Sequence, residues 1–155
     1  GHDNVKSLVY VAAFAPESGE TPAQLVGKFP GGALGAALAP PVKLADGGAD
    51  LYIAQDKFRQ AFAQDLPIAQ TALMAAAQRP ITDAALNGAS GAPAWKTLPS
   101  WFIYGDAARA IPAKALGFMA QRANSKHTVV LKHASHALTV PRPAEVAALI
   151  EEAAK

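Results

Sequence analysis

The 155-residue chain contains no cysteine, which excludes disulfide bonds, thiolate metal ligands and a cysteine nucleophile. Charge is also scarce: 17% of residues are charged, the net charge is +2, and the lysines and arginines are scattered, so no nucleic-acid patch is expected. No apolar run reaches the roughly 18 residues that a membrane helix needs, and no leader peptide is recognisable. We therefore expect a soluble chain, cytoplasmic by default, with neither nucleic acid nor membrane as a partner.

Apolar residues make up 51% of the chain, enough for one domain with a core or for one part of a larger domain. Val5–Phe14 is rich in β-branched and aromatic residues and almost continuously apolar, as in a strand buried on both faces of a parallel sheet. Such a strand needs neighbours on both sides, and only two later segments resemble strands. We expect the exposed strand 5–14 to pair with a missing N-terminal half or with a second copy of the chain.

Residues 22–95 differ in composition from the segments on either side, because glycine- and proline-rich turn sequences alternate with alanine-rich stretches. Phe58 and Phe62 recur at helical spacing within Asp56–Asp65, which predicts an amphipathic helix. A second helix is predicted over Ile68–Gln78. The glycine pairs of this region lack the strand, lysine and serine or threonine of a phosphate loop, so no cofactor is predicted.

Residues 96–155 alternate between strand and helix. The predicted elements are Ser100–Tyr104, Ala113–Ala123, Thr128–Lys132 and Pro143–Ala154. This alternation is typical of parallel α/β architecture, in which catalytic groups lie at the carboxyl ends of strands. Asp106 and His136 each follow a predicted strand, so both are expected at that edge.

His136 has the chemistry of a general base, because the unperturbed pKa of imidazole lies near neutral pH and a nearby carboxylate can fix its tautomer. The alternative is a loop histidine without a catalytic task. His133 precedes it at a spacing that a metal pair would use. With no cysteine or acidic ligand near this loop, no metal site is predicted.

Three segments carry a resemblance to a known family: Leu8–Pro16 (LVYVAAFAP), Trp101–Pro112 (WFIYGDAARAIP) and Lys132–Leu138 (KHASHAL). They resemble the C-terminal half of α/β hydrolases of the esterase and hydroxynitrile lyase-like group. The resemblance implies a partial α/β-hydrolase fold. It divides the chain into a central strand and loop (1–21), a mainly helical cap (22–95) and a C-terminal core with acid loop, base loop and last helix (96–155). It also implies that His136 descends from the family base.

The nucleophile elbow of that family, Gly-x-Ser-x-Gly, must precede the acid and the base in the chain. No serine here has glycine on both sides at that spacing; the serines are Ser7, Ser18, Ser90, Ser100, Ser125 and Ser135. By resemblance, the intact enzyme would hydrolyse a small, largely apolar carboxylic ester with a serine on the absent half. The chain alone is therefore expected to be inactive.

The catalytic acid also departs from the family pattern, since Ala108 occupies its position. Asp106 is a doubtful replacement, because a two-residue shift moves a carboxylate by several ångströms. Its alternative role is to accept backbone N–H bonds within its own turn. Glu17 and Glu20 are further candidates, although solvated turn carboxylates are the simpler interpretation.

Substrate contacts are predicted for Phe58, Phe62 and Met74 on the cap and for Leu138 in the base loop, although apolar residues at helical spacing also suit a core. Two other functions stay open. One is a non-catalytic α/β module, either a degenerate paralogue or a self-pairing fragment. The other is cyanohydrin lyase chemistry on the same fold.

Overall fold

The computed structural model describes residues 4–155, so the first three residues of segment 1–21 lie outside it. A parallel sheet is formed by β1 (Leu8–Val11), β5 (Ser100–Gly105) and β6 (His127–Leu131), in the order β1-β5-β6. Helices α6 (Ala113–Arg122) and α7 (Pro143–Ala153) follow β5 and β6 in the chain. The alternation predicted for residues 96–155 is therefore present, with bounds that differ by one residue.

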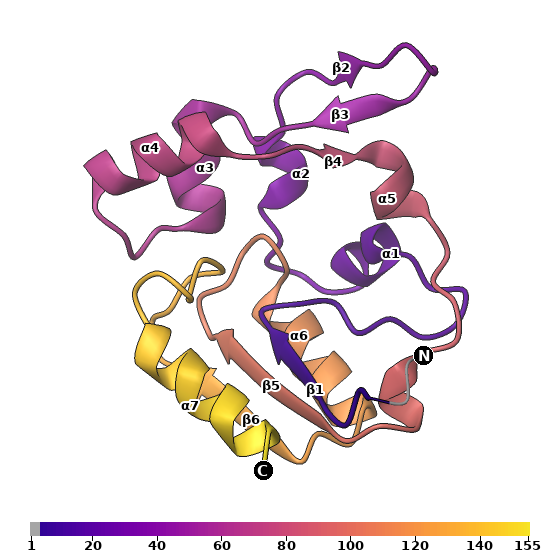
Figure 1. The fold of residues 1–155 in the computed structure, drawn as a ribbon. Helices are drawn as coiled ribbons and strands as arrows, with labels where there is room; N and C mark the ends of the chain where they lie inside the picture. Colours follow the sequence, from indigo (N-terminus) through magenta and orange to yellow (C-terminus); the bar gives the residue numbers. More distant parts are fainter. Residues whose placement is uncertain (1–3) are drawn as a thin grey trace.

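The side chains of the sheet alternate between two helical layers, as the two-residue period of a strand requires. Tyr10 of β1 is paired with Phe102 of β5, and their rings stack at 4.4 Å in the core that α6 covers. Val11 is paired with Ile103 on the opposite face, where α7 supplies the covering residues. Helices thus cover both faces of the sheet, and Figure 1 shows α6 and α7 on either side of it.

Strand β1 is shorter than the apolar segment 5–14 from which it was predicted. It ends at Val11, and the next residue, Ala12, has a φ of 45° in the left-handed region, which turns the chain out of the sheet. Within the described residues, β1 pairs only with β5, and all four of its residues are partly exposed. Its second edge therefore carries backbone groups without a strand partner.

Residues 22–95, the region that the resemblance leads us to expect as a mainly helical cap and that we call the cap, consist mostly of helices with a small sheet among them. Its helices are α1 (Pro22–Gly27), α2 (Leu34–Ala37), α3 (Gln55–Phe62), α4 (Ile68–Ala77) and α5 (Asp83–Asn87), followed by the 3-10 turn η1 (Ala94–Lys96). A small antiparallel sheet of β2 (Val42–Lys43), β3 (Ala49–Leu51) and β4 (Ile81–Thr82) lies among them. The two predicted helices correspond to α3 and α4. The small sheet was not predicted, because strands of two or three residues are too short to show an alternation of apolar and polar residues.

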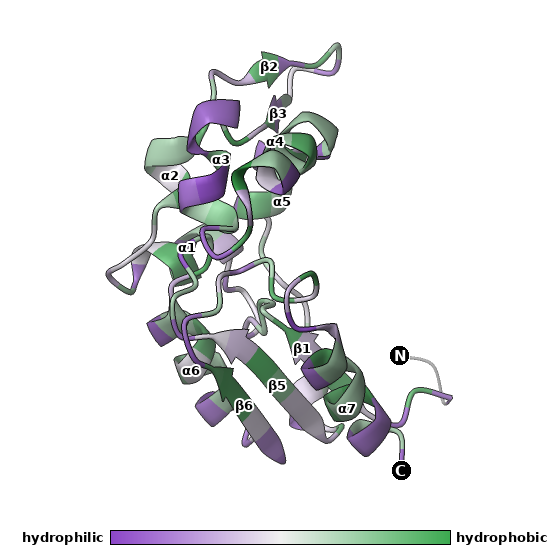
Figure 2. Cartoon of the chain, turned by 90° about the vertical axis from the view of Figure 1, so that its left-hand side faces the viewer, coloured by the Kyte–Doolittle hydropathy of each residue, from purple (hydrophilic) through white to green (hydrophobic). Residues whose placement is uncertain are grey.

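The cap lies beyond the carboxyl ends of the parallel strands. The arrowheads of β1 and β5 in Figure 1, and those of β5 and β6 in Figure 2, point toward it. Phe58 and Ala61 of α3 are buried in the core of the cap, whereas the charged residues of α3 give this helix its purple colour in Figure 2. Any pocket between cap and sheet therefore opens onto the edge where Asp106 and His136 were expected.

Among residues 4–155, no helix is both long enough and apolar enough to cross a membrane.

Candidate active site

Two loops leave the carboxyl ends of β5 and β6: the acid loop, residues 106–112, and the base loop, residues 132–141. Backbone hydrogen bonds join them, because the Asp106 N–H donates to Leu131 O at 3.0 Å and the Ala107 N–H donates to Ala134 O at 3.2 Å. The loops that follow neighbouring parallel strands are thus brought together, as the sequence predicted.

Gly105, the last residue of β5, makes this close approach possible. A Cβ atom added there would collide with the carbonyl group of Ala134 and would lie 2.7 Å from the carbonyl oxygen of Ser135. No side chain fits between the strand end and the base loop. Glycine is therefore required here by space and not by a special φ angle.

The carboxylate of Asp106 stabilises the start of the base loop. Its Oδ1 accepts a 2.7 Å hydrogen bond from the His133 N–H, and its Oδ2 lies 3.5 Å from Lys132 Nζ. His133 has a φ of 57°, so the carboxylate holds a residue in the left-handed region. Asp106 therefore accepts a backbone N–H bond from the neighbouring loop and not from within its own turn, and the described residues show no hydrogen bond from Asp106 to His136.

His136 is partly buried beneath the cap. Its ring meets the ring of Phe62 edge-on, with centroids 4.8 Å apart. Its Nδ1 atom is buried and has no hydrogen-bond partner among residues 4–155. Burial lowers the pKa of His136 to about 4, because an imidazolium would lose its hydration and gain no neighbouring carboxylate. The ring is therefore neutral at pH 7 and able to accept a proton, although it is a weak base.

The position at which the resemblance leads us to expect the acid carries only a methyl group. Ala108 is 5% exposed and packs in the core together with Ile111. Among the described residues, no carboxylate is hydrogen-bonded to the Nδ1 atom of His136.

The two glutamates considered as substitute acids have other partners. Glu17 lies 2.7 Å from Lys96 Nζ, and Glu20 accepts two hydrogen bonds from the guanidinium of Arg122, at 2.8 and 3.0 Å. These hydrogen bonds hold the pKa of both carboxyl groups below their usual values. Neither glutamate is hydrogen-bonded to the imidazole of His136 in the described part of the chain.

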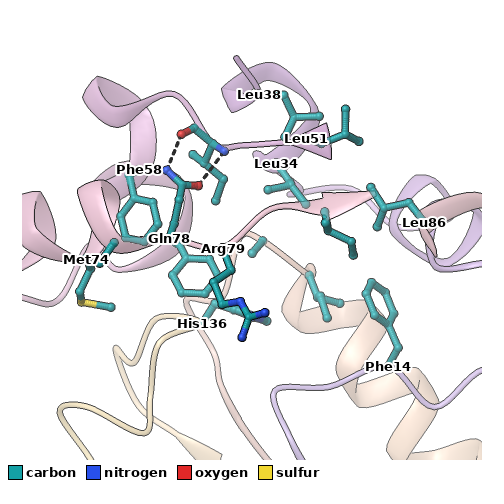
Figure 3. A pocket seen from close by; sticks show the side chains of 16 residues that line it. Phe14, Leu34, Leu38, Leu51, Phe58, Met74, Gln78, Arg79, Leu86 and His136 are labelled. Carbon is teal, nitrogen blue, oxygen red and sulfur yellow. Dashed lines mark hydrogen bonds between the residues drawn. The ribbon is translucent and has the colours of Figure 1, made fainter. Parts of the chain in front are cut away.

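A cavity of about 540 Å³ lies between the cap and the acid loop, with His136 in its wall (Figure 3). Three residues predicted to contact substrate line it: Phe58, Phe62 and Met74. Leu138 does not line it, because its side chain is fully buried in the core that α7 covers. The apolar residues missed by sequence reasoning are Phe14, Leu34, Leu38, Leu51, Ile53, Ala77, Ile81, Leu86, Ala110 and Ile111.

One short segment of the cap, residues 62–65, touches both loops. Gln64 Nε2 donates a 2.5 Å hydrogen bond to the carbonyl of Ala107 in the acid loop. Asp65 Oδ2 accepts one at 3.0 Å from the backbone N–H of Ser135, next to His136. The sequence predicted a helix through residues 63–65, but α3 ends at Phe62. Because Gln64 and Asp65 lie outside the helix, their side chains can contact the acid and base loops.

Comparison with known proteins supports this geometry. The profile of a family described as the alpha/beta hydrolase family matches residues 2–149. A solved polyneuridine aldehyde esterase is 12% identical with a TM-score of 0.79, covering 99% of this chain and 64% of its own. A methylesterase from Arabidopsis is 16% identical with a TM-score of 0.67, covering 98% and 60%. A pyrethroid hydrolase from Sphingobium faniae is 20% identical with a TM-score of 0.61, covering 97% and 61%.

These structural likenesses establish the fold. The chain spans 60–64% of the length of these three solved proteins. No curated protein sequence matches it significantly. The predicted fold class, α/β with a partial α/β-hydrolase arrangement, is confirmed, as is the resemblance noted from the three segments. This chain belongs to the alpha/beta hydrolase family.

Proposed function

We propose that the chain is the C-terminal portion of a serine-type carboxylic ester hydrolase in which His136 is the general base. One observation carries the proposal: the imidazole lies at the carboxyl edge of the parallel sheet and forms part of the wall of an apolar cavity of about 540 Å³. Solved proteins of similar fold include esterases, which supports ester chemistry. Small, largely apolar esters are the proposed substrates.

In the complete enzyme, the hydroxyl of a serine outside these residues attacks the ester carbonyl while His136 takes its proton. The imidazolium then returns that proton to the leaving alkoxide, and the acyl-enzyme is hydrolysed by the same exchange with water. The residue after the nucleophile and an upstream loop supply the oxyanion hole, so they also lie outside this chain. The chain alone therefore contributes a base and a pocket but no covalent step.

The missing acid limits even the complemented enzyme. A carboxylate normally stabilises the imidazolium, and replacing it with an amide lowers turnover about 10⁴-fold in a well-studied serine protease. Burial opposes proton uptake by His136, and with Ala108 at the acid position no carboxylate offsets that cost. Asp106 would have to leave the His133 N–H to act as the acid, at the expense of the base-loop turn.

Complementation tests this proposal. The chain alone should give no turnover of p-nitrophenyl esters and no labelling by a fluorophosphonate probe. Adding the elbow-bearing N-terminal half of an α/β-hydrolase esterase in trans should restore labelling and slow turnover. His136→Gln should abolish the restored turnover, whereas His133→Asn should not, because asparagine tolerates the left-handed conformation found at that position. Restored turnover that survives His136→Gln would exclude His136 as the base.

A second candidate function is a non-catalytic module derived from such an enzyme. The unpartnered Nδ1 atom and the buried methyl group of Ala108 favour it, since both are what an abandoned triad would leave behind. Under this alternative the complemented assembly forms but stays silent toward the fluorophosphonate probe.

A further inference from the structure

The cavity beside His136 has very few polar groups with hydrogen-bonding capacity to spare. Among its lining residues only Gln78, Arg79 and His136 are polar or charged. The amide of Gln78 is already used: its Oε1 accepts from the Ile53 N–H at 2.9 Å, and its Nε2 donates to the Ile53 carbonyl at 2.8 Å. A ligand would therefore meet only Arg79 and His136 as polar side chains with hydrogen-bonding capacity to spare.

Arg79 is the only charged residue in this wall. It lies two residues after the end of α4, next to Pro80, and Figure 3 shows its side chain directed from the cap toward His136. Within residues 4–155 its guanidinium makes no hydrogen bond and no ion pair, and no carboxylate lines the cavity. Asp65 and Asp106, whose carboxylates accept hydrogen bonds from backbone N–H groups of the base loop, do not line the cavity.

The remaining wall is hydrocarbon, with Leu34, Ile53, Phe58 and Phe62 among its residues. Such a surface favours an apolar ligand body, because burying it removes apolar area from water. A guanidinium, in contrast, offers a planar fork of donors that matches a carboxylate in two parallel hydrogen bonds. The two features together describe a ligand with an apolar body and one carboxylate.

We propose that Arg79 selects esters that carry a free carboxylate, binding that group while the apolar body and the ester lie toward His136. This inference rests on the proposed function, because it names the substrate class of the same cavity. A monoester of a dicarboxylic acid has the required chemistry: one ester to be cleaved, a hydrocarbon spacer and one anion. A diester of the same acid lacks only the anion.

Monomethyl suberate and dimethyl suberate are a matched pair for the test, which needs no catalysis. Each compound is added at pH 7.5 to displace the neutral fluorescent reporter N-phenyl-1-naphthylamine from the full chain. The loss of fluorescence gives an inhibition constant for each compound, and the measured quantity is the diester constant divided by the monoester constant. Arg79→Gln should lower this ratio about fivefold, the size expected for one solvent-accessible charge pair. Arg79→Lys should retain most of the preference for the monoester, since lysine keeps the positive charge and loses only the second of the two parallel hydrogen bonds to the carboxylate.

A control variant separates this site from general effects. Lys43→Gln removes one positive charge from an exposed strand of the cap that does not line the cavity, so the ratio should not change. The displacement assay needs no nucleophile and no base, so failed ester complementation and failed carboxylate selection can be told apart. An unchanged ratio in Arg79→Gln, an equal loss in Lys43→Gln, or no saturable reporter binding to the wild-type chain would overturn the proposal.

Discussion

The buried imidazole makes stability dependent on pH in a predictable direction. Burial lowers the pKa of His136 from 6.5 to about 4 in the folded chain, whereas the unfolded chain retains the ordinary value. Below pH 6.5 the unfolded state therefore binds a proton that the folded state refuses, and stability falls as the pH falls from about 6.5 to about 4. Below that range the contribution of this residue is constant.

The size of the effect follows from the two pKa values. At pH 4.5 the linkage amounts to about 2.5 kcal/mol of lost stability, a large fraction of what a domain of this size has. Other groups also titrate in this range, among them Glu17 and Glu20, whose pKa values are lowered by their cationic partners. A comparison with His136→Gln removes their contribution, because both proteins share those groups.

Urea denaturation of both proteins at pH 7 and pH 4.5 measures the difference. We expect the wild-type chain to lose about 2.5 kcal/mol more than His136→Gln over this interval. Nitrogen chemical shifts of the imidazole provide a direct second reading of its pKa. Parallel losses of stability in the two proteins, or an imidazole that titrates near pH 6.5, would refute the argument that burial holds this ring neutral.

Three further predictions concern the same loops. Ala108→Asp should raise the pKa of His136 by about 1 to 3 pH units, measured by its imidazole chemical shifts, because a carboxylate at the acid position favours the charged ring; an unchanged pKa would mean that position 108 does not face it. Gly105→Ala should destabilise the chain by about 3 kcal/mol in urea denaturation, because its methyl group meets the base-loop backbone, whereas Gly91→Ala, with nothing within 4 Å, should be nearly neutral. Asp65→Asn should speed amide hydrogen exchange in the base loop by about a factor of ten, since a charge-assisted bond becomes a neutral one; unaltered exchange would argue against this contact.

Sequence periodicity predicted the elements that are long enough to display it. The strands β5 and β6 and the helices α3, α4, α6 and α7 all occur where apolar spacing placed them. The small sheet of β2, β3 and β4 was not foreseen, because its strands contain only two or three residues and depend on pairing across distant segments. The end of β1 was also missed, since nothing in the apolar segment 5–14 marks the left-handed Ala12.

The candidate site was predictable where its residues follow strands or repeat along helices. His136 and the aromatic pair Phe58 and Phe62 were found in this way, and they share the cavity. Arg79 and Asp65 were not found, because each lies just beyond a helix, where charged residues are usually solvated. Asp65 bonds to the base loop and Arg79 lines the cavity between cap and sheet, and no local pattern encodes either placement.

The close approach of Gly105 to the base loop bears on what keeps His136 in place. Main-chain bonds, the absence of a side chain at Gly105, and the carboxylates of Asp65 and Asp106 on base-loop N–H groups all hold the backbone of the loop, and among the described residues none of these bonds is made to the imidazole itself. The direction of the ring is therefore set indirectly, through the loop that carries it. A substitution at position 108 is thus free to alter the surroundings of the imidazole without removing any of the bonds that fix its place.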